Sequence, residues 1–184
     1  MGRLWTRSNL GLRKKLSIFQ ALIESKLLYS LSACCFNKGQ LRRLDGFQAR
    51  CLRSIQGIAP SFISRVSNRE VLARASWQPL SETLTLQQLA ILGKVLRADQ
   101  TSPLYACSFS EHSLQPLVSQ SVRKVGRPRK ELVPSVVGEA TLRSGRSTNE
   151  LAALAQSCKL WARFMRRFFL NRFVYILYMQ NLAL

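Results

Sequence analysis

The side chains in this sequence that could do chemistry are arginines at helical spacing. Arg42, Arg43, Arg50 and Arg53 fall on one side of a helix that the pattern predicts over residues 40–56. The opposite arc of this helix is apolar and consists of Leu41, Leu44, Phe47, Cys51, Leu52 and Ile55. Because a planar guanidinium matches the geometry of phosphate oxygens, these four arginines are candidates for contacts with a nucleic-acid backbone. The alternative is a helix face that is simply solvated.

A second cationic group lies in the segment 123–130, which reads Arg-Lys-Val-Gly-Arg-Pro-Arg-Lys. Its candidate contacts are Lys124, Arg127, Arg129 and Lys130. The Gly126-Arg127-Pro128 core resembles an AT-hook, a short module that binds the minor groove of DNA. Val125 departs from that pattern, because arginine normally precedes the glycine. Groove insertion, phosphate contact and a solvated basic turn are all compatible with this segment.

A third basic face is expected on the last helix. Ser147 and Glu150 have the spacing of a capping box, which predicts that a helix begins there and continues to about residue 170. Arg163 and Arg167 are its candidate nucleic-acid contacts. They lie opposite an apolar stripe that consists of Leu151, Leu154, Ala155, Cys158, Trp161, Ala162, Met165 and Phe169.

The overall charge also favours a polyanionic partner. The 184 residues include 28 Lys and Arg against 9 Asp and Glu, a formal net charge of +19. The excess is concentrated in residues 1–60 and 151–184. Such a surplus attracts nucleic acid, so RNA or DNA is the expected partner, and no small-molecule substrate is indicated.

Catalytic and metal chemistry are not indicated. The nine acids are never closer than eight positions, and His112 is the single histidine. Five cysteines lack the paired spacing of a zinc site, and three of them fall on apolar helical positions where core burial is expected. No phosphate-binding glycine loop is found. The sequence therefore predicts no catalytic residue, no metal and no cofactor.

The helical pattern predicts an all-α fold, an irregular bundle of about five or six helices. A first helix is expected from Ser8 or Asn9 to about Phe36, and it is apolar on nearly every side, which predicts a central buried element. Asn68 is expected to cap a helix ending near residue 75. Another follows Pro79, with a packing side formed by Leu86, Leu89, Leu92 and Leu96.

This pattern predicts that the chain has four parts. They are a helical region at 1–98, a loop at 99–130 that ends in the basic segment, a helical part at 131–170, and an apolar tail at 171–184 of unclear status. The tail is too short to span a membrane, since crossing takes about 20 residues.

Several segments resemble, in matching order, the region after the palm in non-long-terminal-repeat (LINE-type) retrotransposon reverse transcriptases. They are residues 19–29 (Phe-Gln-Ala-Leu-Ile-Glu-Ser-Lys-Leu-Leu-Tyr), 41–53, 89–96 and the Gly-Arg-Pro at 126–128. The resemblance covers about residues 4–170. It implies thumb and connector helices that bind template–primer backbone, with the remainder of a retroelement polyprotein as a further partner. The family's catalytic Tyr-x-Asp-Asp turn and its Cys/His knuckle are missing from this sequence.

The expected function is therefore noncatalytic binding of RNA or DNA inside the cell, nuclear or cytoplasmic and not secreted. Three alternatives stay open. One is an AT-hook-like chromatin or regulatory protein, and another is a decayed retroelement remnant without function. The third, less favoured, is a membrane-surface protein, since Gly2 fits a loose myristoylation pattern.

Overall fold

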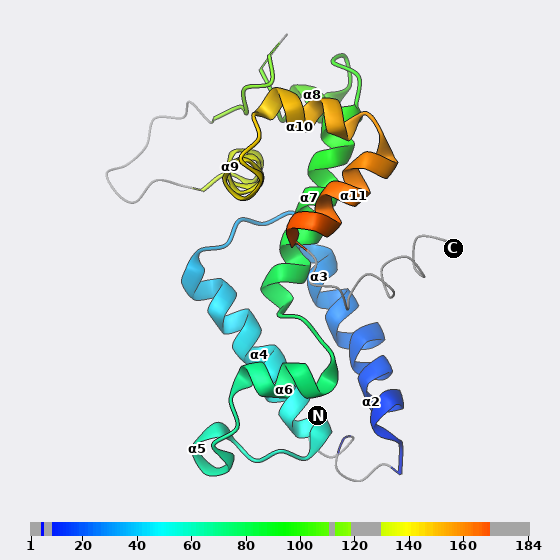
Figure 1. Cartoon of the computed structure of the whole chain (residues 1–184), viewed down its shortest axis with the longest axis vertical. Helices are drawn as coiled ribbons and strands as arrows, with labels where there is room; N and C mark the ends of the chain where they lie inside the picture. The colour runs from blue at the N-terminus through cyan, green and yellow to red at the C-terminus, as the bar shows by residue number, and fades with distance from the viewer. Residues whose placement is uncertain (1–4, 6–8, 111–112, 119–129, 170–184) are drawn as a thin grey trace. The chain divides into compact units, whose positions relative to one another are not determined.

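The computed structural model describes Trp5 and residues 9–110, 113–118 and 130–169 (Figure 1). Its elements are helices, and within these residues the only β-type pairing is an isolated bridge between Phe109 and Pro116. The all-α prediction is confirmed. None of the helices in this part of the chain is both long and apolar enough to cross a membrane.

The chain forms two compact units. The described residues of unit 1 lie within 5–32 and 36–84, and those of unit 2 lie within 33–35 and 85–169. The region 1–98, expected as one part, is thus divided inside a single helix, α7 (Leu80–Arg97). The expected tail at 171–184 and Gly2 lie outside the described residues.

Unit 1 begins with one continuous helical column. The column consists of α2 (Leu12–Phe19), the π-helical turn η1 (Gln20–Glu24) and α3 (Ser25–Leu31). The remaining helices of this unit are α4 (Lys38–Gln56), α5 (Ser61–Ser64), α6 (Asn68–Ala75) and the first residues of α7. In Figure 1, α6 crosses α4, against which it packs.

The prediction that the first helix is buried on every side is wrong. The column ends at Leu31 rather than Phe36, and Leu22 and Tyr29 are 59% and 87% exposed. Phe19 and Leu28 are buried, Phe19 against Trp77 with ring centroids 5.5 Å apart. An apolar pattern shows which residues can be buried, but the number of neighbouring elements decides how many are.

Helix α4 forms close to where its sequence predicts. It begins two residues early, because Asn37 and Gln40 form a capping box in which each side chain bonds the other's backbone N–H. Gly57, with a φ of 69°, ends it in the left-handed conformation that glycine tolerates best. Leu52 and Ile55 of its apolar arc are buried.

A buried glutamine joins α4 to the start of α7. Gln48 is fully buried, its Nε2 donates to the Gln78 carbonyl at 2.9 Å, and its Oε1 accepts from the Leu80 N–H at 3.0 Å. Both ends of the amide are therefore satisfied, as a buried polar group requires.

Unit 2 contains the rest of α7 and four further helices. They are α8 (Pro103–Ala106), α9 (Leu132–Ser144), α10 (Thr148–Ala155) and α11 (Cys158–Phe169). The predicted packing side of α7 is confirmed, since Leu86, Leu89, Leu92 and Leu96 are all buried in its core. The expected loop 99–130 holds α8, and Tyr105 and Phe109 pack into the same core.

A close contact between Gly93 and Trp161 fixes α11 against α7. The Trp161 Nε1–H donates to the Leu89 carbonyl at 3.2 Å, and a Cβ at Gly93 would lie 2.2 Å from that nitrogen. Only glycine fits at this position of α7.

Three local predictions need correction. The capping box of Ser147 and Glu150 is confirmed, but the helix it begins ends at Ala155, and α11 is a separate helix. Ser67 rather than Asn68 caps α6. None of the five cysteines is buried, and Cys51 alone among them packs partly against a core cluster.

Candidate nucleic-acid interface

Three of the four arginines predicted on α4 form an exposed cationic surface. Arg42, Arg43 and Arg50 are exposed. Arg43 and Arg50 are seven residues apart, so the helical repeat places them on the same side of α4, and Arg42 flanks them. No carboxylate of the described residues forms an ion pair with any of the three. We call Arg42, Arg43 and Arg50 the α4 arginine face.

Asp45, the single acid on α4, binds Ser81 of α7 rather than an arginine of the α4 arginine face. The Asp45 Oδ1 accepts from the Ser81 N–H at 2.9 Å, and its Oδ2 accepts from the Ser81 hydroxyl at 2.8 Å. Ser81 lies in the first turn of α7, where backbone N–H groups are left unpaired and a carboxylate is favoured. Asp45 therefore stabilises the beginning of α7 and does not pair with the α4 arginine face.

The prediction that Arg53 belongs to the exposed face is wrong. Arg53 is only 6% exposed, and its Nη2 donates to the Val66 carbonyl at 2.6 Å and to Asn68 Oδ1 at 3.0 Å. Its Nη1 donates to the Ala59 carbonyl at 3.3 Å. The chain after Gly57 folds back over this side of α4, so its backbone oxygens take the guanidinium that the sequence pattern assigns to phosphate.

The other predicted cations lie in unit 2 or outside the described residues. Arg163 and Arg167 are exposed on α11, one turn apart, and Lys130 is exposed just before α9. Lys124, Arg127 and Arg129, with the rest of the hook-like segment, lie outside the described residues. Their binding roles stay predictions.

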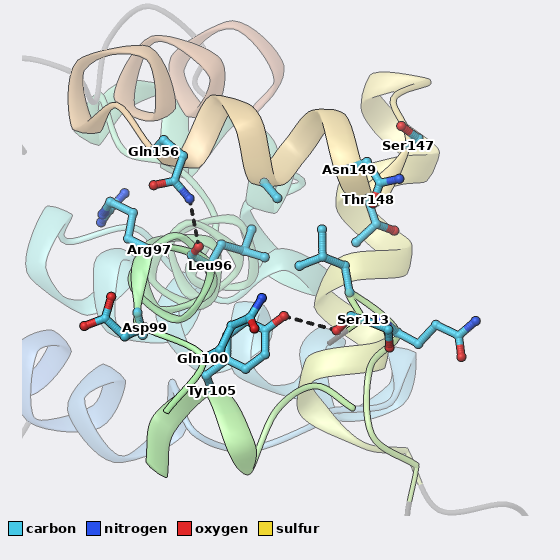
Figure 2. Close-up of a pocket in the computed structure, with 14 residues that line it drawn as sticks. Leu96, Arg97, Asp99, Gln100, Tyr105, Ser113, Ser147, Thr148, Asn149 and Gln156 are labelled. Carbon is cyan, nitrogen blue, oxygen red and sulfur yellow. Dashed lines mark hydrogen bonds between the residues drawn. The ribbon is translucent and has the colours of Figure 1, made fainter. Parts of the chain in front are cut away.

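Unit 2 also contains an open pocket of about 880 Å³ that the sequence did not indicate (Figure 2). Figure 2 shows the first residues of α10 on one side and Tyr105 on the other, with the Tyr105 hydroxyl donating to the Ser113 carbonyl at 3.1 Å. The Arg97 Nη1 donates to the Ala155 carbonyl at 3.0 Å. The residues that line this pocket come from three segments far apart in the sequence, so no local sequence pattern could predict it.

This pocket offers hydrogen bonds but little reactive chemistry. Its lining is rich in amides and hydroxyls, with Arg97 and Asp99 as its charged residues. Arg97 already holds the end of α10, so its guanidinium is partly engaged in the fold. Across the described residues, no three His, Cys, Asp or Glu side chains gather as metal ligands.

One buried carboxyl was also missed by the sequence analysis. Glu24 lies in the π-helical turn η1, is 6% exposed, and its Oε2 has no hydrogen-bond partner among the described residues. Burial raises the pKa of this carboxyl from 4.5 to about 7, because the apolar surroundings disfavour the charged form. A single acid within an apolar run does not show from sequence alone whether it will be buried.

The α4 arginine face is therefore an exposed cationic surface on one helix. No family model matches the sequence, and neither a curated protein nor a solved structure is significantly similar to it.

Proposed function

We propose that this chain binds the phosphate backbone of RNA or DNA through the α4 arginine face and has no catalytic role of its own. The observation that supports this proposal is that Arg42, Arg43 and Arg50 are exposed and form no ion pair with a carboxylate of the described residues. Asp45, the acid of the same helix, binds Ser81 instead. The net charge of +19 supports the same class of partner.

The arrangement suits backbone contact better than base readout. Three cations spread along one rigid helix can each meet a phosphate. Gln40, an exposed amide on the same helix, already accepts from the Asn37 N–H in the capping box, so its oxygen is not available for a bidentate contact with a base edge. Binding is therefore strongly salt-dependent and weakly selective for sequence.

The resemblance to the region after the palm of retrotransposon reverse transcriptases supports template–primer or element RNA as the natural ligand. In this proposal the remainder of a retroelement polyprotein supplies the polymerase, within an intracellular compartment. The helical fold is compatible with a thumb or connector role. No residue of this chain is assigned a catalytic role.

The test compares two double variants that lose the same charge. Arg43→Ala/Arg50→Ala removes two unpaired arginines, whereas Arg74→Ala/Arg143→Ala removes two that pair with Glu70 at 2.7 Å and Glu139 at 2.5 Å. Fluorescence anisotropy with a labelled 20-nucleotide duplex and single strand measures both affinities. We expect the first variant to lose more than tenfold on both and the control less than threefold. Equal losses would show that overall charge, not the α4 arginine face, governs binding.

A further inference from the structure

The short helix α5 presents two large apolar side chains to solvent. Phe62 and Ile63 are 75% and 63% exposed, although they are adjacent in a unit that buries other side chains of this kind. They contribute little to the core, so core packing does not account for two large apolar side chains at these positions. Figure 1 shows α5 on a loop between α4 and α6.

Hydrogen bonds from the buried Arg53 fix the loop that carries Phe62. The Arg53 guanidinium binds the carbonyls of Ala59 and Val66, one on each side of α5. The Ser64 hydroxyl donates to the Ala59 carbonyl at 3.0 Å and accepts from Arg53 Nη1 at 3.4 Å. A loop already fixed in one conformation loses little entropy when it binds a partner.

The surroundings of α5 are cationic. Arg65 and Arg69 are exposed, and neither forms an ion pair with a described residue. The nearest acid in the sequence, Glu70, is paired with Arg74 at 2.7 Å. No acid occurs between Asp45 and Glu70. A partner that combines negative charge with apolar surface therefore complements this loop.

We propose that the α5 loop is a binding site for single-stranded nucleic acid, in which an unpaired base stacks on the Phe62 ring. Arg65 and Arg69 bind the flanking phosphates, and Ile63 covers the edge of the base. This inference rests on the proposed function and deepens it, because it assigns the α4 arginine face to the backbone of either duplex or single strand and the α5 loop to unpaired bases alone.

Single-stranded nucleic acid fits these features better than a lipid surface does. A single myristoyl chain, which carries more apolar surface than Phe62 and Ile63 together, binds membranes only marginally. One aromatic ring is enough for a base to stack on, and arginines beside it meet the adjacent phosphates. In duplex the bases are already stacked on each other, so the ring gains nothing there.

The test measures the full chain and its Phe62→Ala variant on a labelled single strand and a matched duplex at fixed salt. We expect Phe62→Ala to weaken single-strand binding by about 5- to 150-fold, the range for loss of one stacked base, with duplex affinity unchanged within twofold. Phe62→Trp retains single-strand affinity. A 2-aminopurine base in the strand is quenched by the wild-type chain and not by Phe62→Ala.

Tyr29→Ala is the matched control, because Tyr29 is 87% exposed on another helix of the same unit and should leave both affinities unchanged. If the wild-type chain binds both nucleic acids and Phe62→Ala binds them equally well, the α5 inference is overturned and the proposed function stands. If the wild-type chain binds neither, both are overturned. Wild-type binding to phosphatidylserine vesicles that Phe62→Ala abolishes, with single-strand affinity unchanged, would assign the loop to lipid and overturn the inference.

Discussion

The exposed side of α4 and the junction at its C-terminal end use the same residue type in opposite ways. Arg50 is exposed and forms no ion pair within the described part of the chain, whereas Arg53, one turn further along, is buried against the carbonyls of the loop that follows. The difference comes from the returning chain, because its carbonyls at Ala59 and Val66 accept from the guanidinium on this side of α4. An arginine on a helix face therefore becomes a binding group only where no neighbouring carbonyl needs it.

The largest expected effect tests this difference directly. Arg53→Ala leaves the Val66 carbonyl and the Asn68 Oδ1 without the Arg53 donor and removes one of the two donors to the Ala59 carbonyl. We expect a loss of about 2–4 kcal/mol in the free energy of unfolding. Arg50→Ala should change that free energy by less than about 0.5 kcal/mol, as usual for an exposed site. Urea unfolding followed by circular dichroism measures both. Equal stability of the two variants would contradict the structural role of Arg53.

The next effect concerns pH and the buried carboxyl of Glu24. Its pKa in the folded state, about 7, lies above the value of 4.5 expected when unfolded, so the folded state holds the proton more tightly. Its contribution is complete below pH 4.5 and is lost as the pH rises to about 7, by up to about 3 kcal/mol. Glu24→Gln should remove this dependence and be more stable than wild type at pH 8. Urea unfolding at several pH values measures this. If the free energies of unfolding of the two proteins change in parallel between pH 5 and 8, the raised pKa of Glu24 is contradicted.

Two helical glycines differ in the space around them in the same way that Arg50 and Arg53 differ in their surroundings. Gly46 on α4 has open space where a Cβ would be, whereas Gly93 on α7 would place one 2.2 Å from Trp161 Nε1. Gly93→Ala should lower the free energy of unfolding by about 1–3 kcal/mol through overpacking. Gly46→Ala should raise it by about 0.5–1 kcal/mol, because glycine is a poor helix former. Thermal unfolding of both variants checks the sign, and the same sign for both would refute the packing account.

The smallest effect separates the two roles of α4 at one acid. Asp45→Ala removes the carboxylate that binds Ser81, and loss of such a cap lowers the free energy of unfolding by about 1 kcal/mol. It also removes the only negative charge of the helix, so affinity for a duplex should rise by about twofold or less. Anisotropy and urea titration on one preparation measure both quantities. Weaker duplex binding by a folded Asp45→Ala would count against the proposed interface.

The sequence pattern predicted the positions of the helices better than it predicted which side chains would be buried between them. The end of α4 at residue 56, the Ser147 capping box and the packing side of α7 depend on local spacing, and all three were found as expected. The fate of Arg53 depends on carbonyls 6 and 13 residues away. The burial of Gln48 depends on residues 30 and 32 positions distant.

The candidate site shows the same limit. Helical spacing was enough to place Arg43 and Arg50 on one face of α4. It could not show that Asp45 would be engaged by Ser81, 36 residues away. It also could not show that Phe62 would stay exposed, because a lone apolar pair after a proline is as compatible with a core as with a surface.

The central claim is that unpaired arginines on α4 bind phosphates, and the salt dependence of duplex binding tests it most directly. Each phosphate contact contributes about −0.9 to the slope of log K against log salt concentration on duplex DNA. We predict that Arg43→Ala/Arg50→Ala reduces the magnitude of this slope by about 2 relative to wild type. An unchanged slope, or a wild-type slope near zero, would contradict the account.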